Sequence, residues 1–344
     1  SAQLAGMGST QLAALTTEQV QALETQDLAA IRSSVISALG TDQIEALTTA
    51  QAAALKSSQL AALTTEQVQA IGSDDIAALT TAQVGAFTTA QVEALSTAQV
   101  DALTTAEAAA LKATQLAALT TAQVQAIGTD DVAALTSMQL AGMGSTQLAA
   151  LTTEQVQALE TQDVAAIRSS MISALGTDQI VALTTAQAAA LKTSQLAALT
   201  TEQAQAIATD DLAVLSTTQI GALTTAQVEA LGTAQIDALT TAQAAALKAT
   251  QLAALTTAQV QAIGTDDIAA LTSAQLAGMG STQLAALTTE QVQALETQDV
   301  AAIRTSVISA LGTDQIDALT TAQAAALRTS QLAALTTEQV QAIG

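Results

Sequence analysis

Apolar and polar residues follow one another along this chain in a pattern of eight that never loses its register. The pattern is x-[ST]-x-[QD]-[VLI]-x-A-[LI], as in TTAQVQAI at 120–127, and it runs for 42 octads from Gly8 to Ile343. We name the positions of the octad o1 to o8, with Thr16 at o1 and Leu23 at o8. Large aliphatic residues recur at o5 and o8, and Ala recurs at o7. The chain is therefore an array of one short repeated unit.

A continuous α-helix cannot keep this repeat on one face. Eight residues advance an α-helix by about 2.2 turns, so the apolar stripe would rotate by about 80° from one octad to the next. Supercoiling accommodates repeats of about 3.5 or 3.67 residues per turn, and this repeat would require about 4.0. The backbone must therefore change direction once per octad, which predicts a helix of about five or six residues followed by a short turn.

The polar residues of the octad match the start of a helix in two alternative frames. If o1 is the N-cap, Gln at o4 completes a capping box, and the aliphatic residues at o8 and o5 form a hydrophobic staple. If o2 is the N-cap, the Asp pair of Gly-Thr-Asp-Asp at 128–131 lies in the first turn, where the helix dipole favours it. In that frame, the frequent Gly at o1 would close the preceding helix. Both frames are open at this stage, and they could alternate along the chain.

These features predict an all-α solenoid, or superhelix, of very short helices, one per octad. A helix this short does not hold alone in water, so stacking on neighbouring units must stabilise it. The small Ala at o7 lets adjacent helices approach closely. A β-solenoid is the alternative, because Thr, Val and Ile favour strands. Against it, the Ala, Leu, Gln and Glu of each octad prefer helix, and two large aliphatic residues per octad argue against disorder.

A second period lies above the octad. The segment Met-Gly-Ser-Thr-Gln begins at Met7 and recurs at Met143 and Met279, a spacing of 17 octads. We expect residues 1–344 to form a single continuous octad-repeat array. Its super-repeats are residues 8–143, 144–279 and, in part, 280–344. The first two differ at 18 positions, which tandem duplication explains; a lateral contact that repeats every 17 octads is the alternative.

Composition removes most kinds of chemistry. The chain has no His, Cys, Trp, Tyr, Pro or Asn and one Phe, Phe87. Without Cys or His it has no thiolate nucleophile, no imidazole base and none of the usual zinc or haem ligands. The many Ser and Thr residues have no base beside them, so they are typical of helix caps. We therefore expect that the protein is not an enzyme and carries no cofactor.

The charge excludes further classes of partner. Eight basic and 30 acidic residues give a formal net charge of −22, which disfavours nucleic acid and anionic membrane surfaces. No apolar run approaches the roughly 18–20 residues of a membrane-spanning helix, so we expect no membrane insertion. All eight basic residues stand at o1, on one edge of the array. They are Arg32, Lys56, Lys112, Arg168, Lys192, Lys248, Arg304 and Arg328.

Four Asp pairs are the only acidic constellation in the sequence. Calcium takes about 6–8 oxygen ligands, and a carboxylate pair with Thr and carbonyl oxygens supplies part of such a set. Charge at helix N-termini and solubility explain the pairs without a metal, so we predict no metal site. The calcium candidates are Asp74, Asp75, Asp130, Asp131, Asp210, Asp211, Asp266 and Asp267. We interpret the five Met residues and Phe87 as core residues.

The phrase L-T-T-x-Q-V-x-A-L, as at Leu119–Ile127, resembles the octapeptide arrays of giant secreted or surface adhesin-like proteins of proteobacteria. The resemblance covers the entire chain and implies an extracellular or cell-surface location with a structural or adhesive role. Such proteins are also loosely labelled haem-utilisation proteins. This chain, without His, Cys or Tyr, gives that label no support.

We therefore expect a structural protein, a segment or subunit of an extracellular filament, fibre or cell-surface stalk. The alternative is the repeat region of a secreted adhesin that displays repeated ligand or calcium-binding sites. The repeat starts and stops without a polar capping unit. We therefore also expect self-association, as a homopolymer or one very long chain with end-to-end contacts. Salt-dependent lateral contacts would bring the o1 cations to acidic residues of a neighbour, such as the Asp pairs.

Overall fold

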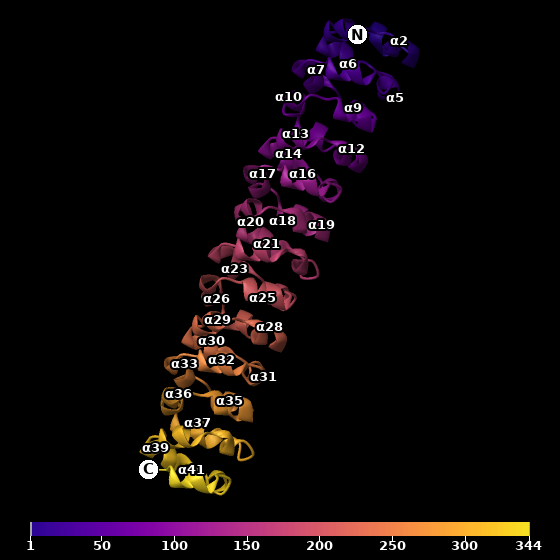
Figure 1. Ribbon diagram of the computed structural model, residues 1–344. Coiled ribbons are helices and arrows are strands. Elements are labelled where there is room, and N and C mark those ends of the chain that lie inside the picture. The colour runs from indigo at the N-terminus through magenta and orange to yellow at the C-terminus, as the bar shows by residue number, and fades with distance from the viewer. Residues whose placement is uncertain (1, 344) are drawn as a thin grey trace. The chain divides into compact units, whose positions relative to one another are not determined.

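The computed structural model describes residues 2–343, whose regular structure is helical, with no strand among them. This part of the chain forms 41 α-helices and two 3-10 helices, one helical element per octad (Figure 1). From α2 onward each α-helix begins at o2 and is four to six residues long, as in α3 (Thr17–Gln21), α7 (Thr49–Ala54) and α10 (Ser73–Ile76). The predicted all-α class is confirmed, and the β-solenoid alternative is wrong.

The short helices stack in a regular order within two compact units, Ser1–Leu175 and Gly176–Gly344. Each helix packs on the one that lies three octads further along the chain. In the first unit α7 packs on α10, and in the second α25 (Thr201–Ala206) packs on α28 (Thr225–Ala230). Each unit is thus a solenoid of very short helices, and the octad pattern continues without interruption across the boundary between the units.

The helices start in the first of the two predicted frames, with o1 as the N-cap. At α16 (Thr121–Gln125), Thr120 Oγ1 accepts a hydrogen bond from the Gln123 backbone N–H at 3.3 Å. In return, the Thr120 backbone N–H donates to Gln123 Oε1 at 2.8 Å, which completes the capping box. The Gln at o4 therefore satisfies one of the free N–H groups that every helix start leaves.

The second frame is wrong even where an Asp pair favoured it. Gly128, which precedes the pair Asp130 and Asp131, is itself the N-cap of α17 (Thr129–Ala133) and has an extended backbone with φ −59° and ψ 150°. None of the described residues has a positive φ, the conformation that a glycine C-terminal cap adopts. The physical reason is that the link between octads runs in extended conformation through o8 and o1, so no left-handed residue is needed.

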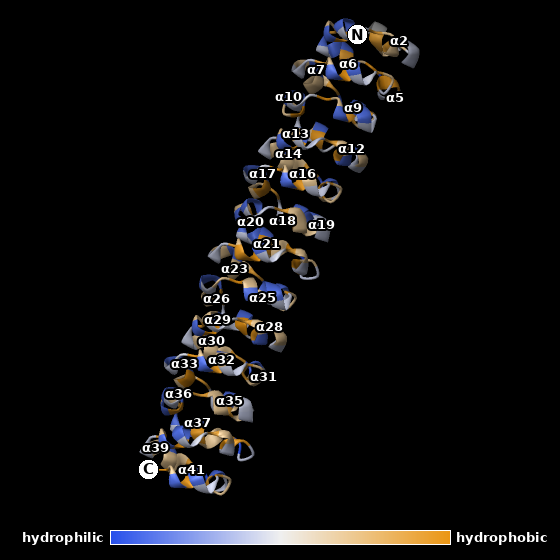
Figure 2. Ribbon diagram, in the orientation of Figure 1, coloured by the Kyte–Doolittle hydropathy of each residue, from blue (hydrophilic) through white to orange (hydrophobic). Residues whose placement is uncertain are grey.

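The aliphatic residues at o5 and o8 form the core, as expected. In the octad of α16, Val124 is fully buried and Ile127 nearly so. Each short helix carries both hydrophilic and hydrophobic residues (Figure 2), so every octad contributes to both the surface and the interior of the solenoid. Phe87 is buried at o8, as are Met143 and Met279. Met138, in contrast, is 79% exposed, so its assignment to the core is wrong. It stands at o3, which faces solvent in most octads.

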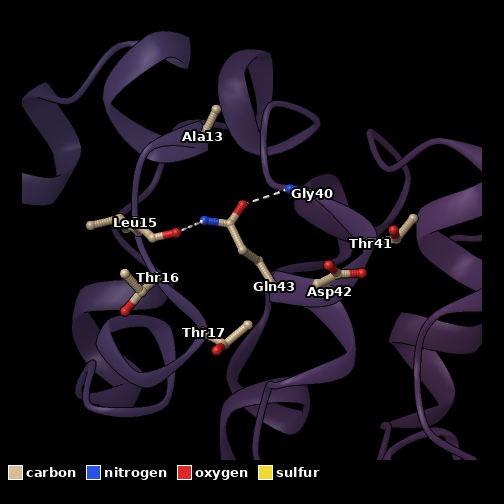
Figure 3. A pocket seen from close by; sticks show the side chains of 8 residues that line it. All are labelled: Ala13, Leu15, Thr16, Thr17, Gly40, Thr41, Asp42 and Gln43. Carbon is tan, nitrogen blue, oxygen red and sulfur yellow. Dashed lines mark hydrogen bonds between the residues drawn. The ribbon is translucent and has the colours of Figure 1, made fainter.

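A ladder of Gln side chains at o4 joins successive turns of the solenoid, and we call it the glutamine ladder. Gln123 Nε2 donates to the carbonyl oxygens of Leu95 at 2.6 Å and Val92 at 2.9 Å, both in the fourth octad back. Figure 3 shows the same arrangement at Gln43, whose amide nitrogen faces the Leu15 carbonyl while its oxygen faces the Gly40 N–H. Since helices stack three octads apart and ladder bonds reach the fourth octad back, a turn holds between three and four octads.

The two Gly residues at o7 lie against the two Ala residues at o2. A Cβ atom added to Gly142 would lie 2.5 Å from the Cβ of Ala113, and one added to Gly278 would lie 2.7 Å from that of Ala249. Each Gly, which replaces the usual Ala at o7, stands three octads after an Ala that replaces the usual Ser or Thr at o2. The two helices can approach this closely only because both side chains are reduced, which agrees with the predicted role of o7 in close packing.

Replacing a ladder residue tests how much the bonds between turns contribute. We expect Gln123→Leu to lower the free energy of unfolding by about 1–3 kcal/mol, because it removes the ladder donor of the Leu95 carbonyl and the acceptor of the Thr120 N–H. The exposed neighbour Gln125 supplies the matched control, and Gln125→Leu should change stability by less than about 0.5 kcal/mol. Urea unfolding followed by circular dichroism measures both. Equal effects of the two substitutions would contradict the ladder's role.

Candidate functional site

Some octads have a residue other than Gln at o4, and at these positions the chemistry of the glutamine ladder differs. Gln stands at o4 in 31 of the 42 octads, and the other 11 octads have seven Asp, one Glu, two Val and one Met there. A Val or Met cannot hydrogen-bond as an amide does, and a carboxylate can accept but not donate. Each exception therefore leaves carbonyl oxygens of the preceding turn without the amide donor that the ladder supplies elsewhere.

An Arg at o1 supplies the missing donor in all three octads whose o4 residue is apolar. Arg168 Nη2 donates to the Met143 carbonyl at 3.2 Å. Met143 stands at o8 of the fourth octad before that of Met171, so this is the carbonyl that a Gln at position 171 would bind. Arg32 and Arg304 donate in the same way to the carbonyls of Met7 at 3.1 Å and Met279 at 2.8 Å, in the octads of Val35 and Val307.

Two of these three octads also differ in backbone conformation. The octads that begin at Arg168 and Arg304 contain the 3-10 helices η1 (Ile172–Ala174) and η2 (Ile308–Ala310) in place of an α-helix. Neither has an o4 side chain that could accept the N–H of o1. The periodic charge that the sequence places at o1 is thus partly an internal device, because these Arg side chains stabilise their own solenoid.

Two of the Asp residues at o4 accept a hydrogen bond from a Ser hydroxyl of another turn. Ser137 Oγ donates to Asp163 Oδ1 at 2.6 Å, and Ser273 Oγ donates in the same way to Asp299 Oδ1 at 2.5 Å. Each hydroxyl stands at o2, three octads before its Asp. Burial raises the pKa of the Asp131, Asp163 and Asp211 carboxyl groups, and a hydroxyl close to each carboxyl offsets part of the rise.

The structure separates the two members of each calcium-candidate pair. The o3 members are exposed, and the o4 members are buried at the third position of the helix. No third acidic residue joins any pair to form a cluster fit for a metal ion in the described part of the chain. The exposed members are Asp74, Asp130, Asp210 and Asp266, and the buried members are Asp75, Asp131, Asp211 and Asp267.

Glu107 is the one Glu at o4, and it is 2% exposed. Its Oε2 accepts hydrogen bonds from the Thr104 N–H at 2.7 Å and the Thr104 hydroxyl at 2.8 Å, so its cap is intact. Its Oε1, which occupies the place of the ladder nitrogen, is the one buried side-chain polar atom among the described residues that has no hydrogen-bond partner. Gln243, at the matching position of the next super-repeat, donates there to three carbonyls.

A comparison with family models gives this array a family. The model of the ALTTAQ repeat matches most of the chain, in ten partly overlapping segments. The chain belongs to the ALTTAQ repeat family. The matched segments of the ALTTAQ repeat are 1–25, 20–57, 68–105, 81–113, 106–137, 124–161, 156–193, 204–241, 260–297 and 292–329. No curated protein matches the chain.

The ALTTAQ phrase covers the segment that links one helix to the next. In Ala118–Gln123 it runs from o7 through the buried aliphatic residue at o8 and the cap Thr120 to the ladder residue Gln123. Sequence reasoning identified the cap but missed the bond to the other turn. The signal was present in the near-constant Gln at o4 and in the coincidence of Arg at o1 with an apolar o4.

Among the described helices of this ALTTAQ array, none is long and apolar enough to cross a bilayer.

The Arg bond can be tested by removal and rescue. We expect Arg168→Ala to lower the free energy of unfolding by about 1–2 kcal/mol, because the Met143 carbonyl loses its donor. Adding Met171→Gln to the same chain should recover most of this loss by restoring the ladder amide. Lys112→Ala is the control, since its octad already contains Gln115, which binds the Phe87 carbonyl at 2.8 Å. Failure of Met171→Gln to rescue would contradict the substitution of one donor by the other.

Glu107→Gln should stabilise the protein. The substitution gives Thr104–Leu111 the same sequence as the octad of Gln243 and supplies the absent donor, so we expect a gain of about 1–3 kcal/mol. The exposed Glu93 provides the control, and Glu93→Gln should have little effect. Thermal melting of the two variants in one buffer measures the difference. A lower melting temperature for Glu107→Gln than for the parent would refute this account of the buried oxygen.

The buried Asp carboxyls predict a pH dependence of definite sign. Because folding raises their pKa, the folded state holds their protons more tightly, and their contribution to stability is lost as the pH rises through the folded-state pKa. A triple variant, with Asn at Asp131, Asp163 and Asp211, should gain melting temperature relative to the parent, and the gain should be larger at neutral pH than at about pH 3. The exposed Glu residues whose pKa is lowered, such as Glu66, are common to both proteins and cancel in the difference.

Proposed function

We propose that this ALTTAQ array is a structural element, a segment or subunit of an extracellular filament, fibre or cell-surface stalk. The observation that carries the proposal is the glutamine ladder. Successive turns are tied together by buried amides such as Gln123 and Gln259, and 31 of the 42 octads have the Gln that makes this joint. Such a chain owes its order to contacts between neighbouring turns, so it can be lengthened by repetition without a new core. The extracellular location rests on the resemblance to surface arrays.

The repeat region of an adhesin is the second candidate, and a repeated surface groove favours it. In the first unit the groove is lined by Thr16, Thr17, Gly40, Thr41 and Asp42 beside the buried Gln43 (Figure 3). The matching groove of the second unit, two super-repeats further along, has the same residue types around Asp314. A groove of about 350 Å³ that recurs in this way presents the same hydroxyl-rich and acidic surface in both units.

Pulling the chain by its two ends tests the structural proposal directly. A structural element should resist extension and unwind turn by turn, because each turn is held by its own ladder bonds. The Gln123→Leu chain should begin to unwind at a lower force than the parent, and the control Gln125→Leu should match the parent. A parent chain that extends at low force like a disordered polymer would contradict a structural role.

A calcium titration separates the two candidates. The structural role predicts that the circular dichroism signal and the melting temperature are indifferent to calcium and to a chelator. A large calcium-dependent gain in order would favour the display of calcium sites. In that case a chain with Asn at the exposed Asp74, Asp130, Asp210 and Asp266 identifies the ligands, since it should lose the response.

A further inference from the structure

Each unit carries its basic residues on one side of the solenoid. Because a turn holds between three and four octads, positions that are seven octads apart lie about two turns apart, and they return to the same side. Positions that are three octads apart lie on adjacent turns. The basic residues are spaced by three, seven and seven octads in the first unit and by seven, seven and three octads in the second.

We call these sets the basic rows, and all their members are exposed. The row of the first unit is Arg32, Lys56, Lys112 and Arg168, and that of the second is Lys192, Lys248, Arg304 and Arg328. Since every member stands at o1, the place of each member around the solenoid depends only on the octad in which it stands. Three of the Arg residues also donate one hydrogen bond to a carbonyl of their own unit, which leaves most donors of each guanidinium available.

The exposed members of the Asp pairs form a second row on a different side, which we call the acidic row. Asp74 and Asp130 in the first unit are seven octads apart, as are Asp210 and Asp266 in the second. Each follows a Lys of the basic row by just over two octads, which is more than half of a turn. Figure 1 shows this separation within the second unit, where α33 (Thr265–Ala269), which carries Asp266, lies on the left and α31 (Ala249–Ala253), capped by Lys248, lies on the right.

From this match in spacing we infer that the basic row docks against the acidic row of a second copy of this chain. Both rows repeat every seven octads, so Lys56 and Lys112 have the spacing of Asp74 and Asp130 whatever the rise of the solenoid. A second copy is the one partner whose sequence guarantees opposite charge at that spacing. The inference rests on the proposed structural role and deepens it, because it names the surface through which one array binds the next.

The chemistry of this contact makes it dependent on salt and on register. Exposed ion pairs are individually weak, so a stable contact requires several pairs along the row. The net charge of −22 on each copy opposes any other side-to-side approach at low ionic strength. Added salt shortens the distance over which exposed charges act, and this weakens the attraction between the rows as well as the repulsion elsewhere. Because the contact depends on that attraction, it should be lost as salt is added.

Sedimentation velocity of the full chain provides the first test. We expect species larger than the monomer at an ionic strength of about 0.01 M, where charges act over about 30 Å, and monomer at about 1 M, where they act over about 3 Å. The circular dichroism spectrum should be the same at both. A chain that is monomeric at high concentration in both buffers would overturn the inference and leave the pulling experiment, which uses single chains, unaffected.

Reversal of each row then tests the surfaces themselves. One variant replaces Lys56, Lys112, Lys192 and Lys248 by Glu, and the other replaces Asp74, Asp130, Asp210 and Asp266 by Lys. Each variant alone should lose association at low salt, and an equimolar mixture of the two should recover it, because the reversed rows are complementary to each other. Recovery in the mixture cannot arise from net charge alone if the control behaves as expected.

The control places the same charge change outside both rows. Replacing the exposed Glu66, Glu93, Glu202 and Glu229 by Lys alters the net charge as much as the Asp reversal does, and we expect this chain to associate like the parent. If a reversed variant loses its helical signal, Gln at the same positions replaces the reversal. Continued association of both row variants, or no recovery in their mixture, would overturn the inference.

Discussion

The buried amide at o4 is the interaction on which the rest of this structure depends. A helix of four to six residues leaves nearly all its backbone groups without partners inside the helix. In this fold the Oε1 of Gln123 accepts the N–H of its own cap, and its Nε2 reaches the carbonyls of Val92 and Leu95 at the end of a helix in another turn. One neutral side chain thus satisfies the start of one helix and the end of another. A backbone that is broken once per octad becomes stable because both breaks are repaired from the same position.

This dependence explains why the departures from the octad come in pairs. Where Met171 removes the amide, Arg168 binds the carbonyl that the amide would have bound. Where Asp163 replaces the amide by a carboxylate, the Ser137 hydroxyl of another turn donates to it. Where Gly142 lets a helix come closer, Ala113 has lost the hydroxyl group usual at o2. The members of each pair stand in one octad or on neighbouring turns, so the constraint acts over these short ranges. Glu107 is instructive because no such partner accompanies it.

The sequence was sufficient for the local structure and insufficient for the way the turns meet. A period of eight forbids a continuous helix, and a hydroxyl at o1 with Gln at o4 predicts a capping box, so the short helices and their core at o5 and o8 followed from residues such as Thr120, Gln123 and Val124. The number of octads per turn did not, because a perfect repeat is the same in every register and carries no mark of which octad contacts which. That information lies only in the exceptions. The coincidence of Arg with an apolar o4, and the seven-octad spacing of Lys and Asp, acquire meaning once the ladder bond between turns is known.

Different positions of the octad stabilise the fold and form the charged surface. Because neutral amides and hydroxyls satisfy the interior, most charge stands at o1, o3 and o6, where it can change without disturbing the ladder, except at the three Arg residues that replace a ladder amide. The eight acidic residues at o4 are the exceptions, and seven of them are Asp, whose shorter side chain suits an acceptor for a hydroxyl. A chain built in this way can vary its exposed positions almost freely. The Lys residues and the exposed Asp residues of the two rows nevertheless return to the same side every two turns, each kind at one octad position, and they are therefore better explained by what the surface contacts than by what the fold requires.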